Sequence, residues 1–196
     1  MPLNSTVRID SHATAMLRHI RASMEAAASL AIPGSALIAT GVVGILAASC
    51  STAASLHEHW LAIWLIAAAV AASLGSALLA RQVSLRELTI AGAPIRKFAI
   101  GFLPTLFAGA VLTAVLAFNG HFQIIPGTWL LLYGCALVAA SAVTVRLVGL
   151  LGASFVALGL IALCLPDEFQ MFMLGAGFGG LHIFFGLLVG RTGHGR

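Results

Sequence analysis

Charged side chains are scarce in this sequence, and their scarcity excludes a water-soluble fold. Only 8% of the 196 residues are Asp, Glu, Lys or Arg, whereas 60% are hydrophobic. A soluble domain carries about 25% charged residues because its surface faces water. The outer surface of this chain must therefore face an apolar medium, and the lipid bilayer is the partner that the composition predicts.

The sequence also lacks the motifs of common enzymes. It contains no GxSxG, no HExxH, no phosphate-binding loop and no nucleophile beside a base within one loop. The three cysteines, Cys50, Cys135 and Cys164, lack the CxxC spacing of zinc and redox sites, and we expect them to be small buried hydrophobes. The sequence therefore predicts a protein that is not an enzyme and binds no cofactor.

Long apolar runs predict the fold. Four runs, over about 30–49, 60–80, 98–118 and 171–190, each have the length of about 20 residues that crosses a bilayer as a helix. The stretch from Thr128 to Leu165, interrupted only by Arg146, is too long for one crossing and predicts two helices joined by a tight turn. We expect an all-α membrane domain over 29–190, with six transmembrane helices arranged as three hairpins.

The basic residues predict the orientation of these helices. If the N-terminus lies in the cytoplasm, all ten Lys and Arg residues fall on the cytoplasmic side. Five of them sit in loops as topology anchors: Arg81, Arg86, Arg96, Lys97 and Arg146. By the positive-inside rule, both termini are cytoplasmic and the chain is a multi-pass protein of a bacterial inner membrane. Because the bases lie at helix ends rather than on one soluble face, we expect no binding of nucleic acid.

The two ends of the chain are polar. Within residues 1–28, hydrophobic residues recur at helical spacing, at Ala13, Met16, Leu17, Ile20 and Met24. This pattern predicts a short amphipathic helix, which lies either on the inner membrane surface or on the cytoplasmic loops. Residues 191–196 are expected to form a cytoplasmic tail.

The last apolar run carries the strongest functional candidate, His182. It shares one helix face with Gly175, Gly179, Gly186 and Gly190, and small residues on such a face let another helix pack closely in lipid. A histidine inside the bilayer is a candidate for function. Its possible roles are proton relay, haem ligand, or hydrogen bonding to a hydroxyl such as that of Thr40, Ser141 or Thr144. The spans contain no second histidine for a bis-histidine haem site and no Asp or Glu for a proton-coupled carrier.

Two further candidates lie elsewhere. Pro104, inside the third run, frees a carbonyl and predicts a kink, which either lines a substrate path or is a proline tolerated in lipid. On the outer side, the histidines His57, His59 and His121 and the acidic residues Glu58, Asp167 and Glu168 come from the three outer loops and could converge. They form either a site for zinc, copper or nickel or a solvated rim at headgroup level.

Two stretches resemble a known group of proteins. The segments PGTWLLLYG at 126–134 and GAGFGGLHI at 175–183 are similar to those of small, uncharacterised bacterial membrane proteins with six helices. The resemblance implies the topology and no activity. We expect a non-enzymatic accessory, sensor or assembly component with a protein partner or as a homo-oligomer. The alternatives are a small transporter or channel with a path near Pro104 and His182, and metal or haem handling at the outer histidines.

Overall fold

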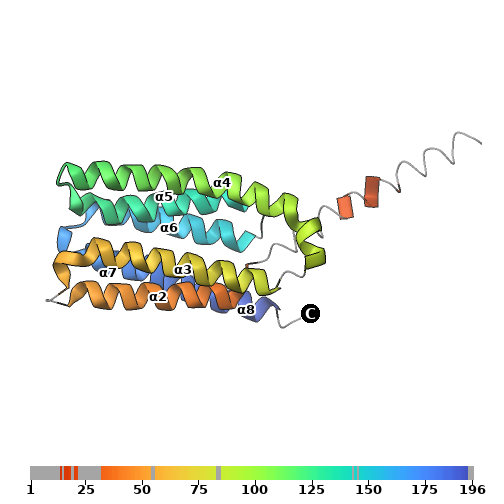
Figure 1. Cartoon of the computed structure of the whole chain (residues 1–196), viewed down its shortest axis with the longest axis horizontal. Coiled ribbons are helices and arrows are strands. Elements are labelled where there is room, and N and C mark those ends of the chain that lie inside the picture. The colour runs from red at the N-terminus through yellow and green to blue at the C-terminus, as the bar shows by residue number, and fades with distance from the viewer. Residues whose placement is uncertain are drawn as a thin grey trace, which may run out of the picture.

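Six apolar helices cross the molecule side by side in the computed structural model (Figure 1). The structure describes residues 14, 16–18, 20–21, 32–53, 56–82, 85–142, 144 and 146–193, whose regular secondary structure is all helical, with short turns between the helices. The first five crossings belong to α2 (Gly34–Thr52), α3 (Trp60–Gln82), α4 (Leu85–Phe118), α5 (Ile125–Ser141) and α6 (Arg146–Cys164). The last consists of α7 (Gln170–Leu174), a π-helix (Gly175–Leu181) and α8 (His182–Gly193).

These helices confirm the six predicted spans and make the chain a multi-pass membrane protein. Each has the length and hydropathy to cross a bilayer, and the two spans predicted between Thr128 and Leu165 are separated at 142–145. The start of the third span differs from the prediction. The apolar run begins near Phe98, whereas the helix that contains it, α4, begins at Leu85. Of the amphipathic segment predicted over 1–28, only residues 14, 16–18 and 20–21 are described, and they are helical. In the predicted tail, residues 194–196 lie outside the described part.

Polar residues gather at opposite ends of the bundle. Short 3-10 turns, His57–His59, Phe122–Ile124 and Asp167–Phe169, lead into α3, α5 and α7 at one end, which we call the acidic end (Figure 1). The described basic side chains of Arg81, Arg96, Lys97, Arg146 and Arg191 belong to the opposite, basic end. The structure thus separates the two kinds of charge along the direction of the helices.

The outer surface of the bundle is apolar. Large side chains such as those of Ile66, Phe107 and Phe172 are more than 60% exposed. The three cysteines are exposed too, so the expectation that they are buried is wrong. The physical reason is that lipid tails are as apolar as a protein core, so a small hydrophobe gains nothing by turning inward.

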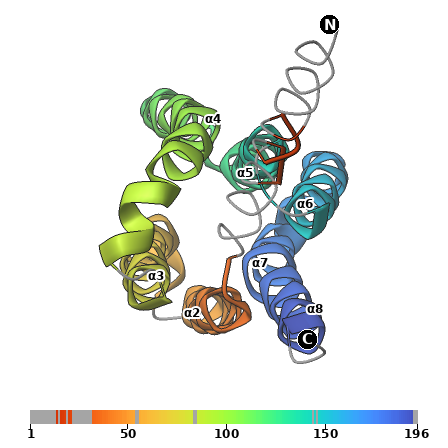
Figure 2. The same ribbon diagram turned by 90° about the vertical axis from the view of Figure 1, so that its right-hand side faces the viewer.

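The interior is built around two tightly packed groups of helices. In one group, α2 packs against α3, the π-helix and α8. In the other, α5 packs against α4 and α6. Seen end-on, α3 and α4 form one flank of the bundle, and α6 and α8 form the opposite flank (Figure 2). Between the groups, Leu130, Phe155 and Leu174 are fully buried.

Glycines allow both groups to pack backbone against backbone. A Cβ atom added to Gly44 of α2 would lie 2.6 Å from the carbonyl oxygen of Phe178 in the π-helix. A Cβ atom on Gly134 of α5 would lie 2.7 Å from the carbonyl oxygen of Gly152 in α6. Since real Cβ atoms do not approach other heavy atoms so closely, only glycine fits at these positions.

We predict that Gly134→Ala destabilises the protein, whereas Gly75→Ala does not. The added methyl group at Gly134 would force α5 and α6 apart, which should lower the free energy of unfolding by about 1–3 kcal/mol. A Cβ atom at Gly75 would meet only the Thr40 Oγ1 atom, at 4.0 Å, so this control should be neutral or slightly stabilising. Unfolding by SDS in mixed micelles measures both; equal stability of the two variants would contradict the packing described.

Candidate functional site

A cavity opens on one side of the bundle between α3 and α4, and we call it the lateral cavity. It encloses about 650 Å³, a size typical of small-molecule sites. The described residues that line it come from four helices and from the π-helix, and none of them is Asp, Glu, Lys, Arg or His. They are Thr40, Val43, Gly44, Leu61, Trp64, Leu65, Ala67, Ala68, Ala71, Ala72, Phe102, Thr105, Leu106, Gly109, Ala110, Thr113, Ala114, Ala117, Trp129, Leu132, Tyr133 and Phe178.

The lateral cavity exists because α3 and α4 are the least covered helices of the bundle. Only 6% of the membrane-spanning window of each is buried, against at least 33% for the other four crossings. α3 packs on α2, α4 packs on α5, and the cavity lies between these pairs. The side chains that α3 contributes to it include four alanines, which leave space where larger residues would fill it.

An aromatic cluster lies at the inner side of the lateral cavity, and its members Tyr133 and Phe178 line the cavity and separate it from His182. The Tyr133 hydroxyl oxygen lies 2.9 Å from the His182 Nε2 atom, and His182 is only 1% exposed. The ring of Phe155 lies 4.9 Å from that of Tyr133 and 5.2 Å from that of His182. Phe178 stacks on His182 with its ring centroid at 6.3 Å, so the histidine is enclosed by rings.

The polar contacts of His182 are few among the described residues. Its Nε2 atom lies within hydrogen-bond distance of the Tyr133 hydroxyl, and its buried Nδ1 atom makes no hydrogen bond. A phenol hydroxyl and a neutral imidazole can each donate or accept, so the bond can form with either tautomer of the histidine. This pair joins α5 to the start of α8.

The π-helix connects the cavity to His182. Four of its seven residues are glycines, which accept the widened turn easily. Phe178, in the middle of this segment, contacts the ring of Trp64 at 5.9 Å and that of Tyr133 at 5.1 Å. Short π-helical segments within α-helices occur often at functional sites. A molecule in the lateral cavity would therefore touch an irregular part of the last crossing.

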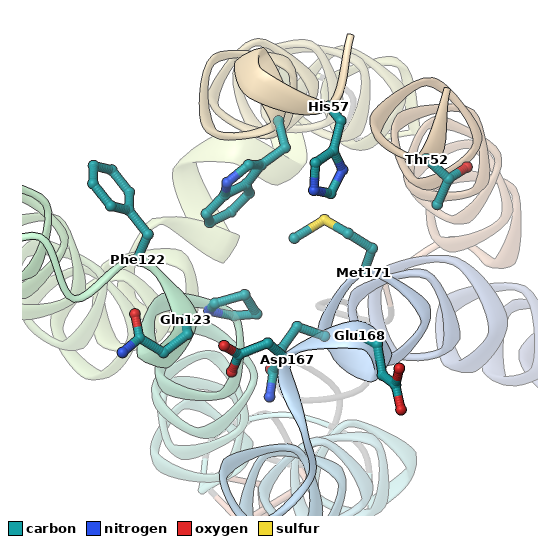
Figure 3. Close-up of a pocket in the computed structure, with 10 residues that line it drawn as sticks. Thr52, His57, Phe122, Gln123, Asp167, Glu168 and Met171 are labelled. Atoms are coloured by element: carbon teal, nitrogen blue, oxygen red, sulfur yellow. The ribbon is translucent and has the colours of Figure 1, made fainter. Parts of the chain in front are cut away.

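A second cavity of about 370 Å³ lies at the acidic end, and we call it the end cavity. His57 and Met171 face one another across it, and Gln123 lies beside Asp167 (Figure 3). The His57 Nδ1 atom donates to the Ser51 carbonyl oxygen at 3.2 Å. Within the described part of the chain, no three His, Cys, Asp or Glu side chains are grouped to hold a metal ion. His57, His59 and His121 are thus not brought together as a ligand set.

The other predicted residues have clear positions. Pro104 is exposed on α4 and does not line the lateral cavity, and α4 continues through it without a break. On the predicted glycine face, Cβ atoms on Gly175, Gly179 and Gly186 would lie within 3 Å of α2 side chains, whereas a Cβ on Gly190 would meet nothing within 4 Å. The anchors Arg81, Arg96, Lys97 and Arg146 are exposed, and the side chain of Arg86 lies outside the described part.

Sequence reasoning missed the partner of His182. It proposed the hydroxyls of Thr40, Ser141 or Thr144, whereas the structure gives Tyr133. One sequence does not show which residues of two helices lie at the same level of the bundle. The loops do not fix how far one helix is shifted along the other, and this shift determines which side chains meet. One signal was present: Tyr133 is the only tyrosine in the chain, and it lies inside an apolar span rather than at an interface.

Comparisons with known proteins add no relative to this description. No protein-family model matches the chain, and neither the curated proteins nor the solved structures contain a significant match. The expected membership in a group of small bacterial membrane proteins stays a prediction. The function proposed below is therefore inferred from the geometry of the cavities and of the residues around them.

We predict that Tyr133 and His182 are energetically coupled. Tyr133→Phe and His182→Leu each leave one buried polar group without a partner, so each should destabilise the protein, but the double variant should lose less than the sum. The expected coupling is about 0.5–2 kcal/mol, the range for hydrogen bonds between membrane helices. A double-mutant cycle by SDS unfolding measures it.

The control cycle combines His182→Leu with Thr128→Val. The Thr128 hydroxyl donates to the Ile124 carbonyl oxygen within the first turn of α5 and has no contact with His182. These two changes should be additive. Additivity of Tyr133→Phe and His182→Leu as well would show that the pair makes no net contribution.

Proposed function

We propose that this protein is a non-enzymatic accessory or sensor component of a bacterial inner membrane, and that it binds an apolar molecule dissolved in the bilayer. The lateral cavity supports this proposal most directly. It has the volume of a ligand site, lies between the two least covered helices, and has a lining dominated by aliphatic and aromatic side chains. An apolar molecule enters such a site sideways from the lipid without crossing a polar surface.

The contacts behind the lateral cavity support a role in sensing. A bound molecule would pack against Phe178, whose ring lies against His182 at the start of α8. A shift of Phe178 therefore changes the packing between the π-helix, Tyr133 of α5 and the last crossing. A ligand that binds one arrangement of these groups better than another would shift the equilibrium between them. A partner protein or a second copy that contacts the last crossing would then read out the change.

The proposed orientation places the basic end in the cytoplasm and the acidic end outside. The separation of described Lys and Arg side chains from Glu58, Asp167 and Glu168 supports it, since basic residues are retained on the cytoplasmic side.

Reporter fusions test this orientation. Green fluorescent protein fused after Arg196 should fluoresce, and alkaline phosphatase at the same position should be inactive. Alkaline phosphatase inserted at Gly120, a turn residue with φ of 76° and open space around it, should be active. The reverse pattern at the two positions would overturn the orientation, while leaving the lateral cavity as described.

A cavity-filling substitution tests ligand binding. Ala71→Phe places a ring inside the lateral cavity, and we expect it to reduce the neutral lipids that remain bound after purification in mild detergent at least fivefold. Ala77→Phe is the matched control, because Ala77 is exposed on the same helix but outside the cavity lining. Extraction and mass spectrometry of the bound lipids measure both variants against the wild type.

The comparison has a clear failing outcome. If the wild type retains no apolar molecule, or if Ala71→Phe and Ala77→Phe retain it equally, the lateral cavity is not the site. The unfolding transition of Ala71→Phe serves as a check that the variant is folded.

A further inference from the structure

Trp64 has an indole N–H group for which the described residues provide no hydrogen-bond partner. The residue is only 4% exposed, it lines the lateral cavity from α3, and its Nε1 atom is buried. A buried donor with no acceptor is costly, and more so inside a bilayer, where no water is available to satisfy it. An acceptor on a molecule bound in the cavity would remove this cost.

Three other polar side chains that line the lateral cavity, those of Trp129, Thr113 and Tyr133, are already paired. Trp129, which also lines the lateral cavity, donates from Nε1 to the Thr113 Oγ1 atom at 2.7 Å, and Thr113 in turn donates to the Gly109 carbonyl oxygen at 2.7 Å. The Tyr133 hydroxyl is bonded to His182. Trp64 therefore differs from these groups in having a free donor.

We propose that the lateral cavity binds a neutral molecule with an apolar body and a carbonyl oxygen, and that this oxygen accepts a hydrogen bond from Trp64 Nε1. The inference rests on the function proposed above and specifies its ligand. Because none of the described residues that line the cavity is Asp, Glu, Lys, Arg or His, they offer no charge to compensate a charged headgroup, and we therefore propose an uncharged ligand. Because the indole nitrogen only donates, the group that meets it is an acceptor.

The rings around Trp64 favour a flat ligand. Phe178 lies 5.9 Å from Trp64, and Phe102 and Tyr133 line the same cavity with their rings 5.8 Å apart. Aromatic walls stack well against planar ring systems. A quinone with an alkyl tail combines a planar ring, neutral carbonyls and solubility in the bilayer. Diacylglycerol is a second source of a neutral carbonyl in membranes, and the experiment separates the two.

The test compares wild-type protein with Trp64→Phe and Trp60→Phe in lipid nanodiscs. The second variant is a matched control, because Trp60 lines the end cavity and is not among the residues that line the lateral cavity. Three molecules are titrated: a benzoquinone with a decyl chain, a short-chain diacylglycerol, and decylbenzene, which has no carbonyl. Quenching of tryptophan fluorescence or displacement of a bound fluorophore gives the affinities, and infrared spectra of ¹³C-labelled carbonyls show whether the oxygen accepts a hydrogen bond.

We expect Trp64→Phe to weaken binding of the quinone by about tenfold, as the loss of one buried hydrogen bond does, and Trp60→Phe to leave it within about twofold. The affinity for decylbenzene should not depend on the Trp64 indole. The labelled carbonyl stretch should shift to lower frequency in wild type and Trp60→Phe and lose that shift in Trp64→Phe. The same pattern with diacylglycerol instead of quinone would support the carbonyl contact and assign it to an acyl lipid.

The failing outcomes are distinguishable. If all three molecules bind wild-type protein and Trp64→Phe alike, with no carbonyl shift, the inference about Trp64 is wrong and the proposed function stands. If none of them binds wild-type protein and Ala71→Phe also retains the same lipids as wild type, the proposed function itself fails.

Discussion

Close backbone contact between α2 and the last crossing is the constraint on which the rest of the structure depends. Within lipid, burial of apolar surface does not drive helices together, so association relies on close packing and hydrogen bonds. Gly41 and Gly44 of α2 lie against Gly179 and Phe178 at distances that no side chain at either glycine would allow. This contact holds the π-helix in place, and with it the ring of Phe178 and the position of His182.

The sequence predicted the parts of the structure that depend on local composition. The apolar runs predicted the six crossings because a helix must satisfy its own backbone in lipid, whatever its neighbours are. The spacing of Gly175, Gly179 and Gly186 predicted a face for close packing, and these positions face α2. The lateral cavity, the π-helix and the Tyr133–His182 bond were not predicted. They depend on how α3, α4 and α5 are placed relative to one another. Because every span is rich in Ala, Leu and Val, the sequence does not indicate which helix packs against which.

The two cavities differ in the chemistry that they offer. The end cavity is bordered by His57, Asp167 and Glu168 and lies where helices begin, so water and polar solutes reach it. The lateral cavity lies along the sides of α3 and α4, and the part of its lining that the structure describes contains no Asp, Glu, Lys, Arg or His side chain. Trp60, at the end cavity, contacts Trp129, at the lateral cavity, with ring centroids 6.3 Å apart. The Trp60–Trp129 pair therefore lies between the polar end cavity and the apolar lateral cavity.

The π-helix also determines which kind of genetic change the last crossing tolerates. A π-helical turn holds one residue more than an α-helical turn does. Deleting a residue such as Gly180, which is exposed and has open space around it, would restore an uninterrupted α-helix from α7 to α8. Because the widened turn had absorbed the extra residue, the side chains beyond the deletion would keep their orientation relative to those before it. His182 and Gly186 would still face Tyr133 and α2, whereas the same deletion within α8 would turn the side chains beyond it by about 100°. The π-helix is therefore a part of this crossing that can lose one codon without turning the helix that follows.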